Sequence, residues 1–222
     1  NVKIRQTDFA LVKENIIAKR YTIVNGNKLD LDLSFLVRSK LYSNDNNMVS
    51  GKVIDNGLIQ YNHDFSFSIF ANKDISGHRI NDVESCFREA VLTDKDYIGM
   101  SNDSAVSYNL GQLKSGDQID FTLFIYIENN NNIKNMEELE EKIENYKKID
   151  VNKEYTQVKK YWTNYLEKHD GLNLRENSNK LVNDRVKEIY KRTILLFPLL
   201  QNEETGGVSA TVEIDENREK SG

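Results

Sequence analysis

Cysteine and proline are almost absent from this chain, which contains one of each in 222 residues. A single cysteine, Cys86, cannot form a disulfide within the chain, so the class of small disulfide-stapled domains is excluded. A catalytic thiol needs neighbouring partners that the sequence does not show, and we expect Cys86 to pack as a small apolar side chain. Because the only proline is Pro198, the turns must be built from asparagine, aspartate and glycine.

Long apolar runs and an excess of positive charge are also missing. No segment is long and apolar enough to span a bilayer, which predicts that the protein has no membrane partner. The net charge of −5 argues against non-specific nucleic-acid binding, because that binding is driven by neutralisation of phosphates. No Gly-rich phosphate loop, G-x-S-x-G or C-x-x-C motif is present, and no signal peptide is visible. Residue 1 is Asn rather than Met, so we expect an internal or processed start, and cytoplasmic and secreted locations both stay open.

Alternating apolar and polar residues dominate the first half of the chain and predict strands. The segment Ile16–Asn25 is rich in β-branched and aromatic residues and ends at a turn. Residues 29–41 show the cleanest period of two, which is typical of a long strand with one buried face. The predicted inward side chains of that strand are Leu29, Leu31, Leu33, Phe35, Val37 and Leu41. Residues 49–54 and 58–63 flank Asp55-Asn56-Gly57, where Asn-Gly predicts a hairpin turn with positive φ.

Three further strands complete the predicted β-region. Residues 65–69 alternate phenylalanine or isoleucine with serine, one strand is expected near residues 85–92, and residues 119–127 alternate apolar side chains after a glycine-containing turn. Several short strands separated by turn signals are typical of an antiparallel sandwich. The predicted fold class is therefore mainly β, with an antiparallel β-sandwich over residues 1–128.

The period changes from two to helical after the polar loop at residues 129–132. Residues 136–148 and 152–169 predict two amphipathic helices, the second ended by Gly171. A third helix, capped by Asn177 or Ser178, places six side chains inward: Leu181, Val182, Val186, Ile189, Tyr190 and Ile194. Residues 193–200 are apolar on every side, which predicts a buried helix end. Too little chain follows to bury it, so we expect the stub of a second domain, whose bare apolar helix favours an artificial dimer.

Candidate metal and sugar sites compete with plain structural roles. The three histidines, His63, His78 and His169, are scattered, and the run Tyr61-Asn62-His63-Asp64 is a weak metal candidate. Asp94, Asp96 and Asp103 could contribute to a calcium site, although loops of sandwiches are often acidic anyway. Neither candidate outweighs its structural alternative, so no metal site and no cofactor is predicted. The aromatic residues of the β-region could stack on sugar rings or form the core: Tyr61, Phe65, Phe67, Tyr97, Tyr108 and Tyr126.

Three stretches together carry a family resemblance. They are residues 44–61 (NDNNMVSGKVIDNGLIQY), 150–162 (DVNKEYTQVKKYW) and 190–210 (YKRTILLFPLLQNEETGGVSA), of which the last is the most specific. The chain resembles the N-terminal part of a bacterial glucoamylase-type enzyme of glycoside hydrolase family 15. That resemblance implies an incomplete super-sandwich of the galactose-mutarotase-like type whose first strands are missing, then a helical linker at 129–176. Residues 177–222 would be the start of a truncated (α/α)6 catalytic barrel.

The resemblance also implies a reaction that this chain cannot perform by itself. Enzymes of that type release glucose from the non-reducing ends of α-glucans with inversion, using one carboxylic acid and one carboxylate base. In the family, a sugar-binding Trp-Pro-Arg-Asp motif and both catalytic glutamates follow a segment like this one, so we expect them beyond Gly222 and no catalytic residue here. Ser209, Ala210 and Glu213 are the candidates for the pocket rim, with a structural role in the barrel as the alternative. The implied partners are the missing barrel and, through it, an α-glucan or maltooligosaccharide.

Two other interpretations stay open. The chain could be the corresponding part of a disaccharide phosphorylase, because those enzymes pair a similar sandwich with a similar barrel. It could also be a free-standing carbohydrate-binding sandwich that uses exposed aromatic residues. The first alternative depends on residues after Gly222, and the second on which aromatic side chains are exposed.

Overall fold

The computed structural model describes residues 1–12, 14–41, 49–87, 91–94, 96–132, 134–169, 180–201 and 206–208. The chain divides into two compact units, Asn1–Val158 and Lys159–Gly222, which are described separately. The first unit holds every named strand, and the second holds the longest helix. No helix in these described ranges is long and apolar enough to cross a membrane.

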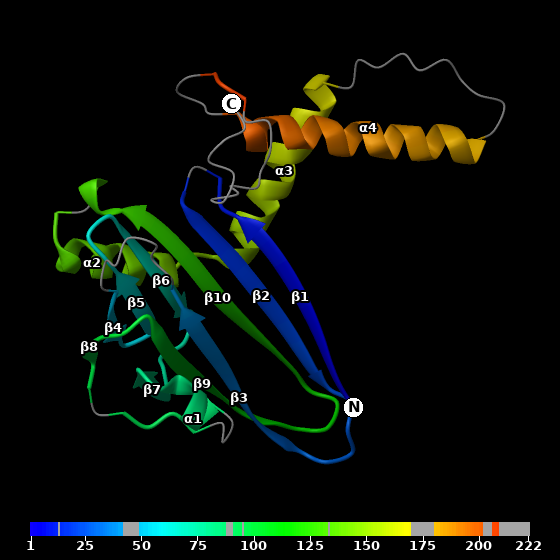
Figure 1. Ribbon diagram of the computed structural model, residues 1–222. Coiled ribbons are helices and arrows are strands. Elements are labelled where there is room, and N and C mark those ends of the chain that lie inside the picture. The colour runs from blue at the N-terminus through cyan, green and yellow to red at the C-terminus, as the bar shows by residue number, and fades with distance from the viewer. Residues whose placement is uncertain are drawn as a thin grey trace. The chain divides into compact units, whose positions relative to one another are not determined.

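A seven-stranded antiparallel sheet forms the larger layer of the first unit (Figure 1). Its strands in spatial order are β1 (Val2–Ala10), β2 (Ile16–Asn25), β10 (Gln118–Asn129), β6 (Phe65–Ala71), β5 (Gly57–Tyr61), β4 (Ser50–Ile54) and β8 (Ile98–Met100). The predicted strand Ile16–Asn25 and the predicted β4–β5 hairpin are confirmed. Within the described residues β1 and β8 are the two edges of this sheet.

A three-stranded antiparallel sheet forms the second layer. Its spatial order is β3 (Leu31–Lys40), β9 (Asp103–Leu113) and β7 (Gly77–Ile80). The long strand predicted at 29–41 is confirmed as β3, but Leu29 precedes it and is 76% exposed rather than inward. The pairing register shifts between Leu33 and Ser34, because Leu33 faces Gly111 and Ser34 faces Asn109. This bulge uses the positive φ of 84° at Gly111, which costs a glycine little.

The core lies between the two sheets and establishes the predicted antiparallel sandwich. Phe121 of β10 is 1% exposed and packs its ring against Phe35 at 4.8 Å and Tyr108 at 5.2 Å, both from the smaller sheet. Ile69 and Val106 face the same cluster from the larger and smaller sheet respectively. Side chains from the inner faces of both layers therefore interdigitate, which is how two stacked sheets bury their apolar surface.

The predicted hairpin between β4 and β5 is present, but the reason predicted for Gly57, a positive φ in the turn, is wrong. Neither Asn56 nor Gly57 has positive φ. A Cβ built on Gly57 would instead meet the carbonyl oxygen of Ile69 at 2.2 Å and the Cα of Phe70 at 2.6 Å. Gly57 is therefore required by the close approach of β6.

The strand predicted near residues 85–92 is also wrong. The chain forms a short helix, α1 (Val83–Phe87), and residues 91–94 have no regular structure. Val83 and Leu92 are buried with Ala105, and Cys86 packs on this cluster, as expected for a small apolar side chain. The helix turns Val83 and Cys86, three residues apart, toward one apolar cluster.

Two helices follow the last strand of the first unit, after a single turn at η1 (Asn130–Asn132). The predicted helix at 136–148 is confirmed as α2 (Met136–Lys147), which is capped by the Asn135 side chain and buries Leu139 and Ile143. It lies against β6, on the face of the larger sheet away from the core. The predicted second helix is confirmed as α3 (Val151–His169), whose Tyr155 ring packs 5.3 Å from Phe9.

The second unit contains α4 (Lys180–Leu200), which has many exposed apolar side chains. The prediction that six of its side chains point inward is wrong within the described chain, since no residue of α4 is buried. Leu181 is 80% exposed and Ile189 53%, and near the end Leu199 is 63% exposed. Residues 193–200 are likewise not buried within this chain, so their predicted burial against a second domain stays a prediction. The predicted caps Gly171, Asn177 and Ser178 lie outside the described residues.

Candidate functional site

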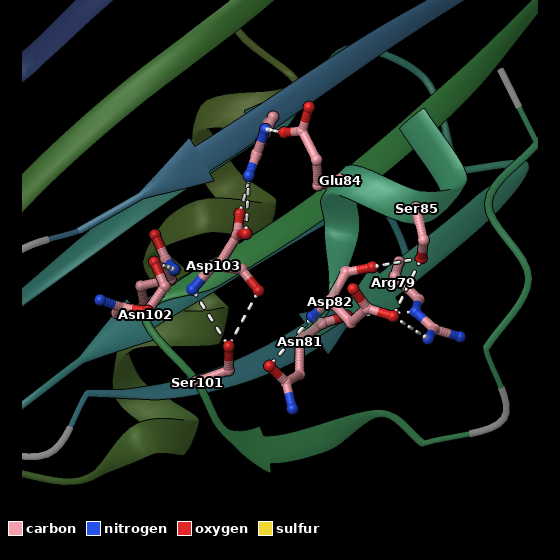
Figure 2. A network of polar contacts seen from close by, with 10 residues as sticks. Arg79, Asn81, Asp82, Glu84, Ser85, Ser101, Asn102 and Asp103 are labelled. Atoms are coloured by element: carbon pink, nitrogen blue, oxygen red, sulfur yellow. Dashed lines mark hydrogen bonds and ion pairs between the residues drawn. The ribbon is translucent and has the colours of Figure 1, made fainter. Parts of the chain in front are cut away.

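A network of charged side chains joins the ends of several strands at one end of the smaller sheet (Figure 2). At its centre, Arg38 of β3 donates to both carboxylate oxygens of Asp103 at the start of β9, from Nε and Nη2 at 2.8 Å each. Its remaining Nη1 donates to Glu84 of α1. These hydrogen bonds, mainly the ones to Asp103 and then the one to Glu84, raise the pKa of Arg38, so the guanidinium is permanently charged.

The turn between β7 and α1 is the second part of this network. Asn81 and Asp82 have φ values of 69° and 47°, a conformation that few non-glycine residues adopt. Their strain is offset by local hydrogen bonds, because Ser85 Oγ donates to the Asp82 carbonyl at 2.9 Å and to its carboxylate at 3.0 Å. The Asn81 N–H donates to the Asp103 carbonyl at 2.9 Å, which ties the turn to β9.

A fully buried glutamine extends the network into the larger sheet. Gln60 of β5 is 0% exposed, accepts from Ser39 Oγ and donates to the Asn102 carbonyl at 3.0 Å. Ser101 Oγ donates to the Asp103 carbonyl at 2.9 Å. A buried amide without partners is costly, so these bonds hold the two sheets in one fixed register at this end.

The arrangement is suited to holding loops in place and offers no catalytic pair. Asp103 and Glu84 both face the Arg38 guanidinium, and Asp82 lies 3.7 Å from the Arg79 guanidinium. Within the described residues no group of three or more His, Cys, Asp or Glu side chains could hold a metal.

The weak metal candidates of the sequence are not brought together. The His63 side chain is 90% exposed and contacts only its neighbour Asp64 among the described residues, at 2.9 Å. Asp94 accepts the backbone N–H groups of Ile80 and Asp96, at 2.9 and 3.1 Å, so it caps a turn. Asp103 is bound by Arg38. The acidic residues proposed for calcium therefore have separate structural partners.

The other two histidines also have structural contacts. His78 is 6% exposed, with its Nε2 at 3.1 Å from the Asp96 carbonyl and its ring 4.5 Å from that of Tyr97. His169 Nδ1 lies 2.7 Å from the Tyr165 carbonyl at the end of α3. His78 and His169 each have a ring nitrogen within hydrogen-bond distance of a backbone carbonyl, as expected for histidines with a structural role.

Two of the six candidate sugar-stacking aromatic residues belong to the buried core. Tyr108 and Tyr126 are buried, at 0% and 2% exposure, and the three from β5 and β6 are half-buried. Tyr97 is the one exposed member, at 61%. Tyr97 is therefore the member of these six positions that exposes most of its side chain. The pocket-rim candidates Ser209, Ala210 and Glu213 lie outside the described residues.

A second polar cluster, which the sequence did not indicate, lies beneath α2. Tyr126 donates to Glu128 at 2.6 Å, and Tyr146 of α2 donates to Glu14 at 2.6 Å, with the two rings 5.5 Å apart. Burial alone would raise the pKa of Glu128, but hydrogen bonds from Tyr126, Asn132 and the Asn129 N–H outweigh it and lower the pKa below 4.5. Burial and the bond to Glu128 raise the pKa of Tyr126, so the phenol stays a donor.

Acid is expected to destabilise the sandwich through Glu128. Because its pKa is lower in the folded state, the carboxylate contributes stability above its unfolded pKa near 4.5, and that contribution is lost as pH falls through the folded value. The urea midpoint should therefore be steady from pH 7 to about 5 and decline below about 4.5.

Glu128→Gln tests this assignment against a matched exposed acid. The variant should lower the urea midpoint at pH 7 and flatten its decline in acid. Glu141→Gln, on the exposed side of α2, should leave both unchanged. Equal acid sensitivity in the wild type and Glu128→Gln would show that other groups carry the effect.

Comparison with known proteins rests on the fold alone. No family model matches the chain, and no curated protein matches it. A solved bacterial glucoamylase in complex with acarbose superimposes with a TM-score of 0.62 at 14% identity, covering 90% of this chain and 28% of the other. The fold is glucoamylase-like.

A second solved structure has a related fold. It is a putative kojibiose phosphorylase from the human microbiome, with a TM-score of 0.52 at 12% identity, covering 74% of this chain and 21% of the other. The chain thus spans less than a third of the length of either structure. The glucoamylase-like fold therefore accounts for most of this chain, although this chain corresponds to a minor part of each neighbour.

Proposed function

We propose that this chain is the N-terminal, non-catalytic part of a glucoamylase-like glycoside hydrolase, in which the sandwich supports a catalytic (α/α)6 barrel. One observation carries the proposal: the bacterial glucoamylase matches 90% of this chain but extends far beyond it, since the match covers 28% of that protein. The carboxylates of the polar network are paired with guanidinium groups, as suits a supporting role. The chain's role is then to hold and position a barrel.

The uncovered helix α4 supports the barrel part of the proposal. Leu181, Val182, Val186 and Ile189 recur at helical spacing and are all at least 40% exposed. Leu196, Phe197 and Leu199 add exposed apolar surface at the end of the helix. Apolar surface of this extent is typical of an interface. In the proposed protein, α4 is the first barrel helix and its neighbours cover this face.

The proposed reaction is release of glucose from the non-reducing end of an α-glucan with inversion. A carboxylic acid protonates the leaving oxygen while a carboxylate on the other side of the ring activates water. Both groups belong to the proposed barrel, after Gly222. Ser209, Ala210 and Glu213 would approach the rim of its pocket, through their position just after α4.

The experiment compares this 222-residue chain with a longer chain that includes the residues encoded after Gly222. The longer chain should release β-glucose from maltotetraose, followed by proton NMR of the anomeric signal. The 222-residue chain should release none. Hydrolysis by the 222-residue chain, or none by the longer one, contradicts the proposal.

A disaccharide phosphorylase is the second candidate, favoured by the likeness to the putative kojibiose phosphorylase. A phosphorylase needs a phosphate site where the hydrolase keeps its catalytic base. Adding inorganic phosphate with kojibiose or maltose to the longer chain separates the two. A glucose 1-phosphate product identifies a phosphorylase, whereas free glucose independent of phosphate identifies a hydrolase.

A further inference from the structure

A polar groove with a volume of about 550 Å³ lies on the larger sheet, over β1, β2 and β10 and beside the start of α3. The pairing registers explain its lining. Arg5 of β1 faces Thr22 of β2, and Thr7 faces Arg20, so their side chains share one face of the sheet. Phe9 lies on this same face and packs on Tyr155, which places the groove opposite the smaller sheet.

One cation in the groove is already neutralised. Arg20 Nη2 donates to Asp120 at 3.1 Å, and its Nη1 donates to Asn152 at 2.7 Å. Thr22 Oγ1 donates to the other oxygen of Asp120 at 2.7 Å. The hydrogen bond from Thr22 lowers the pKa of Asp120. Burial opposes this effect and Arg20 adds to it, and the net pKa is lowered, so the carboxylate stays charged and balances the charge of Arg20.

Two further cationic side chains in the groove, Lys3 and Arg5, have no carboxylate partner among the described residues. Lys3 and Arg5 line the groove and are exposed, and neither forms an ion pair with the parts of the chain that the structure describes. They stand two residues apart on one strand face, about 7 Å between their Cα atoms, so both side chains can reach one anion. A guanidinium fork and a flexible ammonium are the pair that proteins use to hold phosphate oxygens.

We propose that this groove binds a sugar phosphate, with its phosphate group between Lys3 and Arg5. The space is within the range of small-molecule sites and much larger than a phosphate group needs. The remaining lining suits hydroxyl groups, because the Thr7 hydroxyl and the Gln118 amide can each donate and accept hydrogen bonds. The Tyr155 ring, held by Phe9, forms the one aromatic wall.

All residues that line the groove belong to the unit Asn1–Val158, so this chain holds the complete groove. Binding can therefore be measured on this chain by isothermal titration calorimetry, with glucose 6-phosphate as the probe and glucose and inorganic phosphate as separate arms. Glucose 6-phosphate should bind saturably, inorganic phosphate at least about tenfold more weakly and glucose weaker still, because only the ester engages both ends of the groove.

The variant pair Lys3→Gln with Arg5→Gln should weaken glucose 6-phosphate binding at least about tenfold, since two charge-assisted contacts are lost. The control pair Lys73→Gln with Lys134→Gln removes the same net charge at exposed lysines outside the groove and should bind as the wild type does. Unchanged urea midpoints establish that all variants are folded. Absent binding, equal binding of phosphate and glucose 6-phosphate, or equal losses in both variant pairs would overturn the proposal.

Discussion

Replacing Phe121 with alanine is expected to destabilise the sandwich by about 3–5 kcal/mol, the usual cost of removing a buried phenylalanine. Phe121 is 1% exposed and contacts rings from both sheets, so the cavity would open where the two layers meet. Urea unfolding followed by circular dichroism measures the loss. Because Phe35 and Tyr108 also pack around the ring, collapse of the site is limited and the upper part of the range applies.

Ile98→Ala is the matched control, because Ile98 lies on the edge strand β8 and is 60% exposed. Its cost should stay below about 0.5 kcal/mol, as for most surface substitutions. Phe121→Leu should fall between the two, since it keeps part of the apolar volume. A loss below about 1 kcal/mol for Phe121→Ala would mean that the two sheets do not share one core.

Gly57→Ala is expected to cost at least about 3 kcal/mol, at or above the upper end for overpacking a well-packed site. The new Cβ would lie 2.2 Å from the Ile69 carbonyl oxygen, which is backbone and cannot rotate away. Strands β5 and β6 would have to separate locally, and their ladder bonds would weaken. Differential scanning calorimetry gives the change in melting temperature.

Gly111 is a useful comparison for Gly57, because backbone conformation rather than crowding favours glycine at position 111. Its φ is 84° and nothing lies within 4 Å of a built Cβ, so Gly111→Ala should cost only about 1–2 kcal/mol of backbone strain. Asparagine tolerates positive φ, so Gly111→Asn should cost less than Gly111→Ala. Gly57→Asn should cost more than Gly57→Ala. The reverse order at Gly57 would indicate that backbone conformation, rather than crowding, requires its glycine.

Strands with one buried face could be predicted from sequence because alternation is visible there. Strand β9 was missed, since Ser104, Ala105, Val106, Ser107 and Tyr108 are all buried and alternation disappears when both faces are covered. The sequence predicts a strand where helix α1 forms, because five residues are too few to reveal a helical period. The positive φ predicted at Asn56-Gly57 was wrong, because Gly57 is required by the close approach of strand β6. That approach depends on tertiary packing and leaves no signal in the local sequence.

The sites depended on distant pairings that sequence does not encode locally. Arg38 and Asp103 are 65 positions apart, and only the β3–β9 register brings them together. The groove likewise needs Arg5, Arg20 and Gln118 to share one sheet face, which the order β1-β2-β10 provides. Of the six aromatic candidates, Tyr108 and Tyr126 are buried as the core interpretation predicts, whereas Tyr97 is 61% exposed.

We propose that the apolar face of α4 packs against a second domain of the same polypeptide. Amide hydrogen exchange at residues 181–199 tests it directly, in this chain and in the chain extended through the residues encoded after Gly222. A helix without tertiary packing opens readily, so exchange should be fast here and at least about a hundredfold slower in the longer chain. Equal exchange in the two chains would contradict the claim, because the added residues would then give α4 no protection.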